Sequence, residues 1–229
     1  MANSCKTRRD HLTSATRQTN RHISGQTGMT LVEISLVVMI SLILAAIAIP
    51  SAVTAIRMAH LRGAASDYSG LLEQARIYAV RDNKYYATYI LAPTGTDLVA
   101  QAYVDLTKNG GAGVVAGDPS ITIESDVIQQ AVGGAPNTAD LKSQLLPAIT
   151  PVTPIDTSVT APTFGPRGLP CTPLTLSGTT NIICDNSGGA TAFWTFLENT
   201  KSSSWQAVTI TPAGRIQRWF YNGTTWTKL

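Results

Sequence analysis

The hydrophobic and polar positions divide the chain into three parts, the first of which is an apolar run. Residues 29–49 are almost entirely apolar, and Glu33 is their only charged side chain. At about 1.5 Å per residue, a helix of this length crosses a bilayer core of about 30 Å. A lone carboxylate is costly there, by about 2.5–3.5 kcal/mol at the centre of a span. We therefore expect Glu33 to have a partner.

The second part has the pattern of an amphipathic helix. It begins after Pro50, which loosens or kinks a helix because it lacks a backbone donor. Apolar residues then recur at steps of three and four, which predicts one helix face packed on a sheet. These residues are Leu61, Ala65, Tyr68, Leu72, Ala75 and Ala79. We predict a single helix from Met29 to about Asn83.

The third part is β-like. Runs rich in Tyr, Ile, Val and Thr predict strands over 85–91, 98–106, 121–128, 190–197, 205–211, 215–221 and 225–229. A short helix is expected over 141–146, and seven prolines in 147–173 predict a long irregular loop. The fold class is therefore α+β, with a long N-terminal helix packed on an antiparallel β-sheet head.

Charge separates the first 28 residues from the rest. They carry Lys6 and four arginines against one aspartate, a net charge of +4, so the remainder carries −1 of the overall +3. The basic character of the chain therefore does not indicate affinity for nucleic acid. A basic segment ahead of an apolar helix places the N-terminus in the cytoplasm. Arg57 and Arg62 follow the helix on the side where this rule disfavours them.

The start of the apolar run resembles a known family. Gly28 followed by Met-Thr-Leu-Val-Glu, with Pro50 closing the run, is similar to the prepilin signature of type IV pilins and type II secretion pseudopilins. The resemblance implies that a prepilin peptidase cuts between Gly28 and Met29 and N-methylates Met29. It also implies that Glu33 is the glutamate used in assembly. The sequence departs from the family in starting the mature chain with Met instead of the usual Phe.

Two further motifs resemble the GspH/FimT-like minor pseudopilins within this family. Residues 71–80 with Asn83 are similar to the helix pattern of that group, and 210–216 to its C-terminal strand–Gly–strand element. The middle of the chain, 92–190, carries no matching motif. The implied organisation is a removed leader (1–28), a transmembrane and filament-core helix (29–50), an amphipathic helix (51–83) and a periplasmic β-rich head (84–229).

The resemblance implies a structural subunit of a type II secretion or type IV pilus filament. Its partners would be other pilin or pseudopilin subunits, the prepilin peptidase and an inner-membrane assembly platform. It would cross the bacterial inner membrane once, with a cytoplasmic N-terminus and a periplasmic head, before entering a periplasmic or surface filament. A major type IV pilin is one alternative. An ordinary secretory signal cut after Ala46 or Ala48, or a plain single-pass anchor, are simpler alternatives, and the anchor leaves Glu33 unexplained.

A DNA-binding minor pilin for natural transformation is the remaining alternative. FimT-like members of that kind use a Gly-Arg-x-Arg element, and here Arg215 matches while Gln217 replaces the second arginine. Arg215 and Arg218 are expected on opposite faces of a strand, with Trp219 on the face of Arg215 and able to stack on bases. We favour a packed hairpin and expect nucleic-acid binding to be weak.

Cysteine and histidine usage restricts the remaining chemistry. Cys171 and Cys184 flank a turn cluster in a region expected to be oxidising, which predicts a disulfide, with two unpaired buried thiols as the alternative. Beyond the leader only His60 remains, and we expect it to be an exposed helix residue. Asp118, Glu124 and Asp126 lack EF-hand spacing. We expect no enzyme activity, no cofactor and no metal site.

Cleavage between Gly28 and Met29 is the first testable prediction. The intact mass of the membrane-extracted protein should correspond to a chain beginning at a methylated Met29 when the peptidase is present, and to the full chain when it is absent. Gly28→Ala should leave the precursor uncut in the membrane. A mature terminus after Ala46 or Ala48 would contradict the pilin interpretation.

Overall fold

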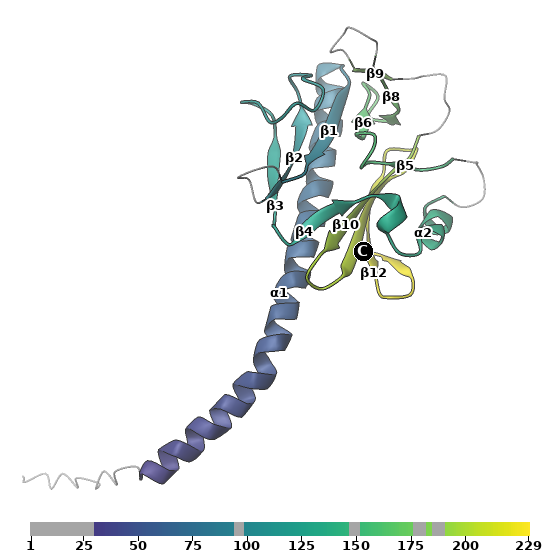
Figure 1. Cartoon of the computed structure of the whole chain (residues 1–229). Helices are drawn as coiled ribbons and strands as arrows, with labels where there is room; N and C mark the ends of the chain where they lie inside the picture. Colours follow the sequence, from purple (N-terminus) through teal and green to yellow (C-terminus); the bar gives the residue numbers. More distant parts are fainter. Residues whose placement is uncertain (1–29, 94–98, 147–151, 176–181, 185–190) are drawn as a thin grey trace, which may run out of the picture. The chain divides into compact units, whose positions relative to one another are not determined.

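The long helix and the β-rich region expected from the sequence are both present. The computed structural model describes residues 30–93, 99–146, 152–175, 182–184 and 191–229. Over these residues the chain forms a long helix and antiparallel β-sheets (Figure 1), in agreement with the α+β class. Its contacts divide it into two compact units, Met1–Ala46 and Ile47–Leu229.

Helix α1 spans Leu31–Asp82, close to the predicted bounds. Pro50 lies inside it and does not end it. The helix ends at Asn83, which takes a left-handed φ of 53°. The N–H of Lys84 then donates to the carbonyl of Ala79 at 3.1 Å, which satisfies one of the last helical acceptors.

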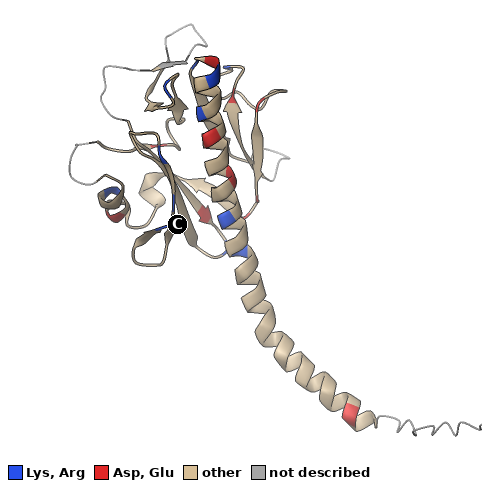
Figure 2. Ribbon diagram, turned by 180° about the vertical axis from the view of Figure 1, so that it is seen from behind, with Lys and Arg blue, Asp and Glu red and all other residues tan. Residues whose placement is uncertain are grey.

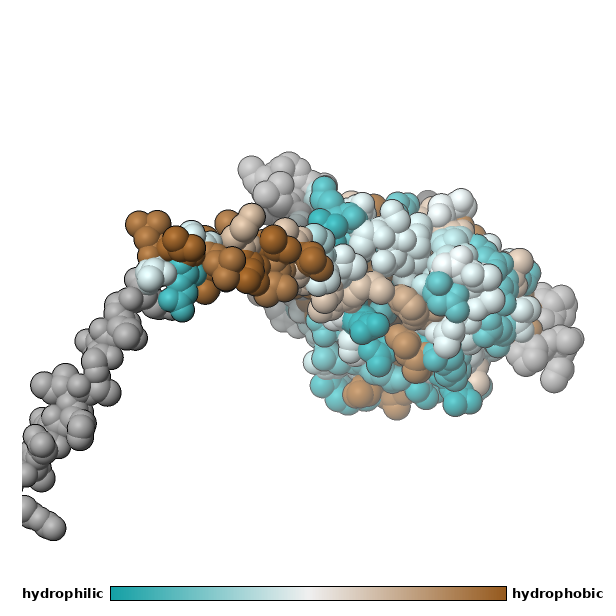
Figure 3. Space-filling view, turned by 90° about the horizontal axis from the view of Figure 1, so that it is seen from below, coloured by the Kyte–Doolittle hydropathy of each residue, from teal (hydrophilic) through white to brown (hydrophobic). Residues whose placement is uncertain are grey.

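The two units contain parts of α1 with opposite surroundings. In the first unit the apolar side chains of α1 are exposed, and they form the brown segment of the helix in Figure 3. In the second unit α1 buries one face, and the six residues predicted for that face are all buried together with Ala64 and Leu71. The predicted amphipathic pattern is therefore confirmed.

The first sheet of the second unit is antiparallel throughout, with the strand order β3-β2-β1-β6-β7. Its strands are β1 (Tyr86–Leu91), β2 (Ala100–Asp105), β3 (Ser120–Ile123), β6 (Thr163–Phe164) and β7 (Pro170–Cys171). β1 and β2 pair over five residues, from Ala87 opposite Asp105 to Leu91 opposite Gln101.

The second sheet has the order β13-β12-β11-β10-β4, and the short β5 adds to β10 in parallel. Its strands are β4 (Val127–Gln130), β5 (Ile155–Asp156), β10 (Phe193–Asn199), β11 (Ser204–Ile210), β12 (Ile216–Tyr221) and β13 (Trp226–Lys228). A third, two-stranded sheet pairs β8 (Pro173–Thr175) with β9 (Ile182–Cys184). Helix α2 spans Thr138–Leu145, preceded by a 3-10 turn over Val132–Gly134.

The second sheet is buried on both faces, and each face has its own cluster. The face toward α1 joins the main core, which includes Phe193, Leu197 and Val208. The opposite face packs against α2 and holds four aromatic rings with Leu141. These rings belong to Trp194, Phe196, Trp219 and Trp226. Burial on both faces explains why the first five residues of β10 are all buried, without the alternation of a half-exposed strand.

Two of the predicted elements are wrong. The strand expected over 121–128 is two strands, β3 and β4, which belong to different sheets. A turn separates them, and in it the N–H of Val127 donates to the carbonyl of Glu124 at 2.9 Å. The irregular loop expected over 147–173 contains β5, β6 and β7. One of its prolines, Pro170, is accommodated because it lies on the edge strand β7, where a missing N–H costs little.

A close contact between two turns fixes the end of the second sheet against α1. Gly214, between β11 and β12, has φ +75°, and Gly168, in the turn after β6, has φ +70°. A Cβ added at Gly214 would lie 2.8 Å from the carbonyl oxygen of Gly168, and the Arg76 side chain of α1 lies beside both glycines. This contact brings the two short motifs at 71–80 and 210–216 together.

Gly214→Ala should lower the free energy of unfolding by about 1–3 kcal/mol, because it adds a steric clash to the strain of a left-handed residue. Gly223→Ala is the matched control, since Gly223 also has a positive φ of 97° but open space around it. Urea unfolding of the full chain in detergent, followed by tryptophan fluorescence, measures both. Equal losses would show that the contact with Gly168 contributes nothing.

Candidate functional site

The first candidate site is the beginning of α1, where Glu33 lies in the first turn. Thr30 precedes the helix, and its Oγ1 accepts the N–H of Glu33 at 3.3 Å, as the first half of a capping box does. A carboxylate in the first turn also gains about 0.3–1 kcal/mol from the helix dipole. This gain comes without an opposite charge, because Glu33 forms no ion pair among the described residues.

The Ser and Thr hydroxyl groups of α1 before Arg57 all have hydrogen-bond partners within the helix. Ser35, Ser41, Ser51 and Thr54 each donate to a carbonyl three or four residues earlier in α1, at 2.7–3.1 Å. Such internal bonds remove most of the cost of placing a hydroxyl in an apolar medium. After Glu33 the next charged residue is Arg57, and the ribbon is tan between them in Figure 2. α1 is therefore long and apolar enough to cross a membrane.

A second polar site lies where α1 enters the core of the second unit, and we call it the clasp. It consists of Arg57, His60, Asp126 and Asn199. Nδ1 of His60 lies 3.1 Å from Oδ1 of Asp126, and Nδ2 of Asn199 donates to Oδ2 of Asp126 at 2.7 Å. The same amide donates to the backbone carbonyl of Arg57 at 3.2 Å. The clasp thus ties α1 to the β3–β4 turn and to the end of β10.

The clasp corrects the expectation for His60. This residue is half-buried and hydrogen-bonded to Asp126, where an exposed residue was expected. Burial acts to raise the pKa of Asp126, but the hydrogen bonds from Asn199 and His60 outweigh it and lower the pKa overall. No sequence spacing signals this site, because its members are 66 and 73 residues apart.

Two buried aspartates elsewhere are used by a loop. Asp105 accepts the N–H groups of Asn109 and Gly110 at 3.0 and 2.9 Å, and Asp118 accepts those of Leu106 and Val115 at 3.1 Å. Their oxygens therefore organise the Gly-rich connection between β2 and β3. Within the described ranges, no three His, Cys, Asp or Glu residues gather where they could hold a metal ion.

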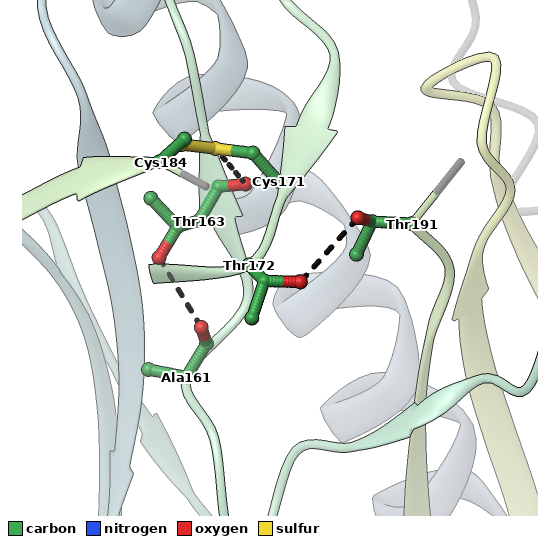
Figure 4. Close-up of a disulfide and its surroundings, with 6 residues drawn as sticks. All are labelled: Ala161, Thr163, Cys171, Thr172, Cys184 and Thr191. Carbon is green, nitrogen blue, oxygen red and sulfur yellow. Dashed lines mark hydrogen bonds between the residues drawn. A yellow bond between two sulfur atoms is a disulfide. The ribbon is translucent and has the colours of Figure 1, made fainter. Parts of the chain in front are cut away.

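The predicted disulfide is present and joins two sheets. Cys171 of β7 is bonded to Cys184 of β9, with Cα atoms 5.5 Å apart (Figure 4). Cys171 Sγ also lies 3.6 Å from the carbonyl oxygen of Thr163 in β6. The bridge ties the two-stranded sheet to the edge of the first sheet. Closing a loop of this length contributes about 3 kcal/mol by constraining the unfolded chain.

The two arginines considered for nucleic acid line one groove, which corrects the expected divergence. The groove has a volume of about 560 Å³ between α1 and the β12–β13 edge. Arg218 lies opposite Val208, on the sheet face toward α1, and Arg215 reaches the same groove from the turn before β12. Glu73 lines it too and lies 3.7 Å from Arg76. The shared groove could not be predicted from strand alternation, because Arg215 precedes β12 and alternation does not apply to it.

Trp219 does not belong to this groove. Its ring is 3% exposed and packs on the α2 face, and its Nε1 donates to Thr209 Oγ1 at 2.9 Å. It is therefore not available to stack on a base, and the expectation that it shares a face with Arg215 for this purpose is wrong. The expectation of weak nucleic-acid binding now depends on the net charge alone and stays a prediction.

The remaining sequence candidates are Gly28, Met29 and Pro50. Gly28 and Met29, the expected cleavage and methylation site, lie outside the described residues. Pro50 is inside α1, as expected for a residue that perturbs but does not end a helix. Comparison with protein-family models, curated proteins and solved structures finds no match to this chain.

Asp126→Asn should destabilise the second unit at neutral pH by about 1–2 kcal/mol, because charged hydrogen bonds are stronger than neutral ones. The folded pKa of Asp126 is lowered, so its contribution is full above the unfolded value of about 3.9 and is lost as pH falls through the folded value. The difference between wild type and variant should therefore vanish in acid.

Urea unfolding at pH 7 and at about pH 3 measures this difference. Glu124→Gln is the matched control, because Glu124 is exposed two residues earlier in the same turn and should show no difference at either pH. A loss in Asp126→Asn that persists unchanged in acid would contradict an electrostatic role for the carboxylate.

Proposed function

We propose that the chain is a structural minor pilin or pseudopilin subunit of a type II secretion or type IV pilus filament. In this proposal prepilin peptidase removes residues 1–28, and the apolar part of α1 first anchors the head and then forms the filament core. The observation that carries the proposal is Glu33, the single charge in an exposed apolar helix segment.

The Glu33 carboxylate needs an opposite charge in an apolar medium. Cleavage after Gly28 would create a positive amine at Met29, about 6 Å along the helix axis from Glu33. The cap from Thr30 and the helix dipole stabilise the carboxylate by about 0.3–1 kcal/mol but supply no opposite charge. Pairing with the amine of a neighbouring subunit neutralises both charges in an apolar medium, which favours docking and departure from the bilayer. A plain anchor gives Glu33 no such use.

The second unit supports a role as an exported head. It has a disulfide, which persists in oxidising compartments. It also has a continuous hydrophobic core that α1 itself completes. A major type IV pilin would be built in the same way, so the choice of a minor subunit depends on the resemblance of 71–80 and 210–216 to the GspH/FimT-like group.

Glu33→Ala should leave membrane insertion and cleavage intact and strongly reduce filament incorporation. The reason is that the variant inserts more easily but lacks the partner of the incoming amine. Membrane fractionation measures insertion, which should be equal to or greater than that of the wild type. Immunoblots of sheared filaments measure incorporation, which should be much lower.

Two controls separate charge from local structure. Thr30→Ala removes the helix cap, at a cost of about 1 kcal/mol, but keeps the carboxylate and should still assemble. Glu73→Ala removes an exposed acid from the same helix inside the head and should also assemble. Normal assembly of Glu33→Ala would show that Glu33 is not the assembly contact and would favour the plain anchor.

A further inference from the structure

Three cations near the start of the head have no role in the proposed function. They are Arg57 and Arg62 of α1 and Lys201 of the β10–β11 turn. Among the described residues none of the three forms an ion pair with a carboxylate. Arg57 donates from its guanidinium to the backbone carbonyl of Lys201 at 3.0 Å, which places the backbone of Lys201 beside α1. We call this group the collar.

The clasp holds the collar in place and offsets part of its charge. Asp126 accepts a hydrogen bond from Asn199 and lies 3.1 Å from Nδ1 of His60, and these contacts leave its negative charge in place. Oδ1 of Asn199 accepts the N–H of Lys201 at 3.1 Å, so the β10–β11 turn is fixed beside α1. Asp126 and Glu124, which is exposed in the β3–β4 turn, offset at most two of the three positive charges. Glu198, next to Asn199, is already used because it accepts from Nε2 of Gln130 at 2.7 Å.

The collar begins where the apolar surface ends. Val53 and Ile56 are exposed at 37% and 55%, and Arg57 follows directly. Arg62 is five residues further, a rise of about 7.5 Å. A bilayer with a core of about 30 Å and a total thickness of about 40–45 Å has headgroup layers of about 5–8 Å on each side. The helical cations therefore span about one headgroup layer beyond the apolar segment.

We propose that the collar binds the anionic phospholipid headgroups of the leaflet on the head's side of the membrane. This proposal rests on the proposed function only in requiring that α1 cross the bilayer. Arg57 and Arg62 are about 140° apart around the helix axis. That arrangement suits headgroups, which surround a helix on all sides, better than one flat macromolecular partner. Because α1 tethers the collar at the bilayer surface, weak contacts are sufficient for occupancy.

The collar also resolves the conflict with the positive-inside rule. Cations on the far side of a span weaken the orientation signal, so their presence there needs a benefit. The benefit is that contact with the headgroups holds the second unit against the leaflet. This contact keeps the base of the head oriented before assembly. Each net positive charge near an anionic lipid increases the occupancy of that lipid by about fivefold, and about one net charge remains here once Asp126 and Glu124 are counted.

The test uses the full chain in vesicles and a fluorophore near the collar. The fluorophore is attached at Ala59→Cys, an exposed position two residues after Arg57, with Cys5→Ser to remove the other free thiol. Two vesicle samples of phosphatidylcholine are compared. One contains a trace of phosphatidylglycerol with a quenching spin label on its headgroup, and the other contains the same amount of phosphatidylcholine with the same label. We expect the anionic lipid to quench about fivefold more efficiently, and about 0.5 M salt to remove the difference.

The triple variant Arg57→Gln, Arg62→Gln, Lys201→Gln should quench equally with both lipids. Arg215→Gln, Arg218→Gln, Lys228→Gln is the matched control, since it removes the same charge from the groove and should retain the preference. No preference in the unmodified chain, or a preference unchanged in the collar variant, would overturn the proposal while leaving membrane insertion intact. No quenching by either lipid would instead show that α1 does not place Ala59 at the bilayer surface, which contradicts the proposed function as well.

Discussion

The need of one helix for two different environments is the constraint on which the structure depends. α1 exposes apolar side chains without interruption in its first part, which in water would cost about 25 cal/mol for each Å². Beyond Leu61 the same helix buries one face completely, and its other face exposes polar residues together with Ile77 and Val80. No single solvent suits both parts. The polar groups between them, in the clasp and the collar, mark the place where one environment gives way to the other.

The second unit is organised by the same helix. The buried row of α1 contacts residues of both large sheets, so neither sheet completes a core without it. The second sheet then carries a separate aromatic cluster on its far face, closed by α2. The sheets are linked at their edges by short-range devices, namely the Cys171–Cys184 bridge and the contact of Gly214 with Gly168. These covalent and steric contacts add to the shared core in holding the sheets together.

The sequence predicted those features that arise from local periodicity. The helix, its buried face, the hairpin of β11 and β12, and the disulfide were all predicted, because spacing along the chain determines each of them. The division of 121–128 was missed because the turn there is fixed by groups from elsewhere, among them His60 and Asn199. The common groove of Arg215 and Arg218 was missed because the turn, not strand alternation, sets the direction of Arg215. Such features depend on contacts between distant residues, which one sequence does not reveal.

The clasp has a mechanical consequence for a chain that is pulled through its helix. Tension along α1 reaches the second unit first at Arg57 and His60, before it reaches the buried row that begins at Leu61. Polar contacts are short-ranged and break over a small extension, whereas the apolar row beyond them resists as a set, since sliding the helix displaces all of its side chains together. The head would therefore yield in two stages under load, a soft first step at the clasp and a stiffer one in the core.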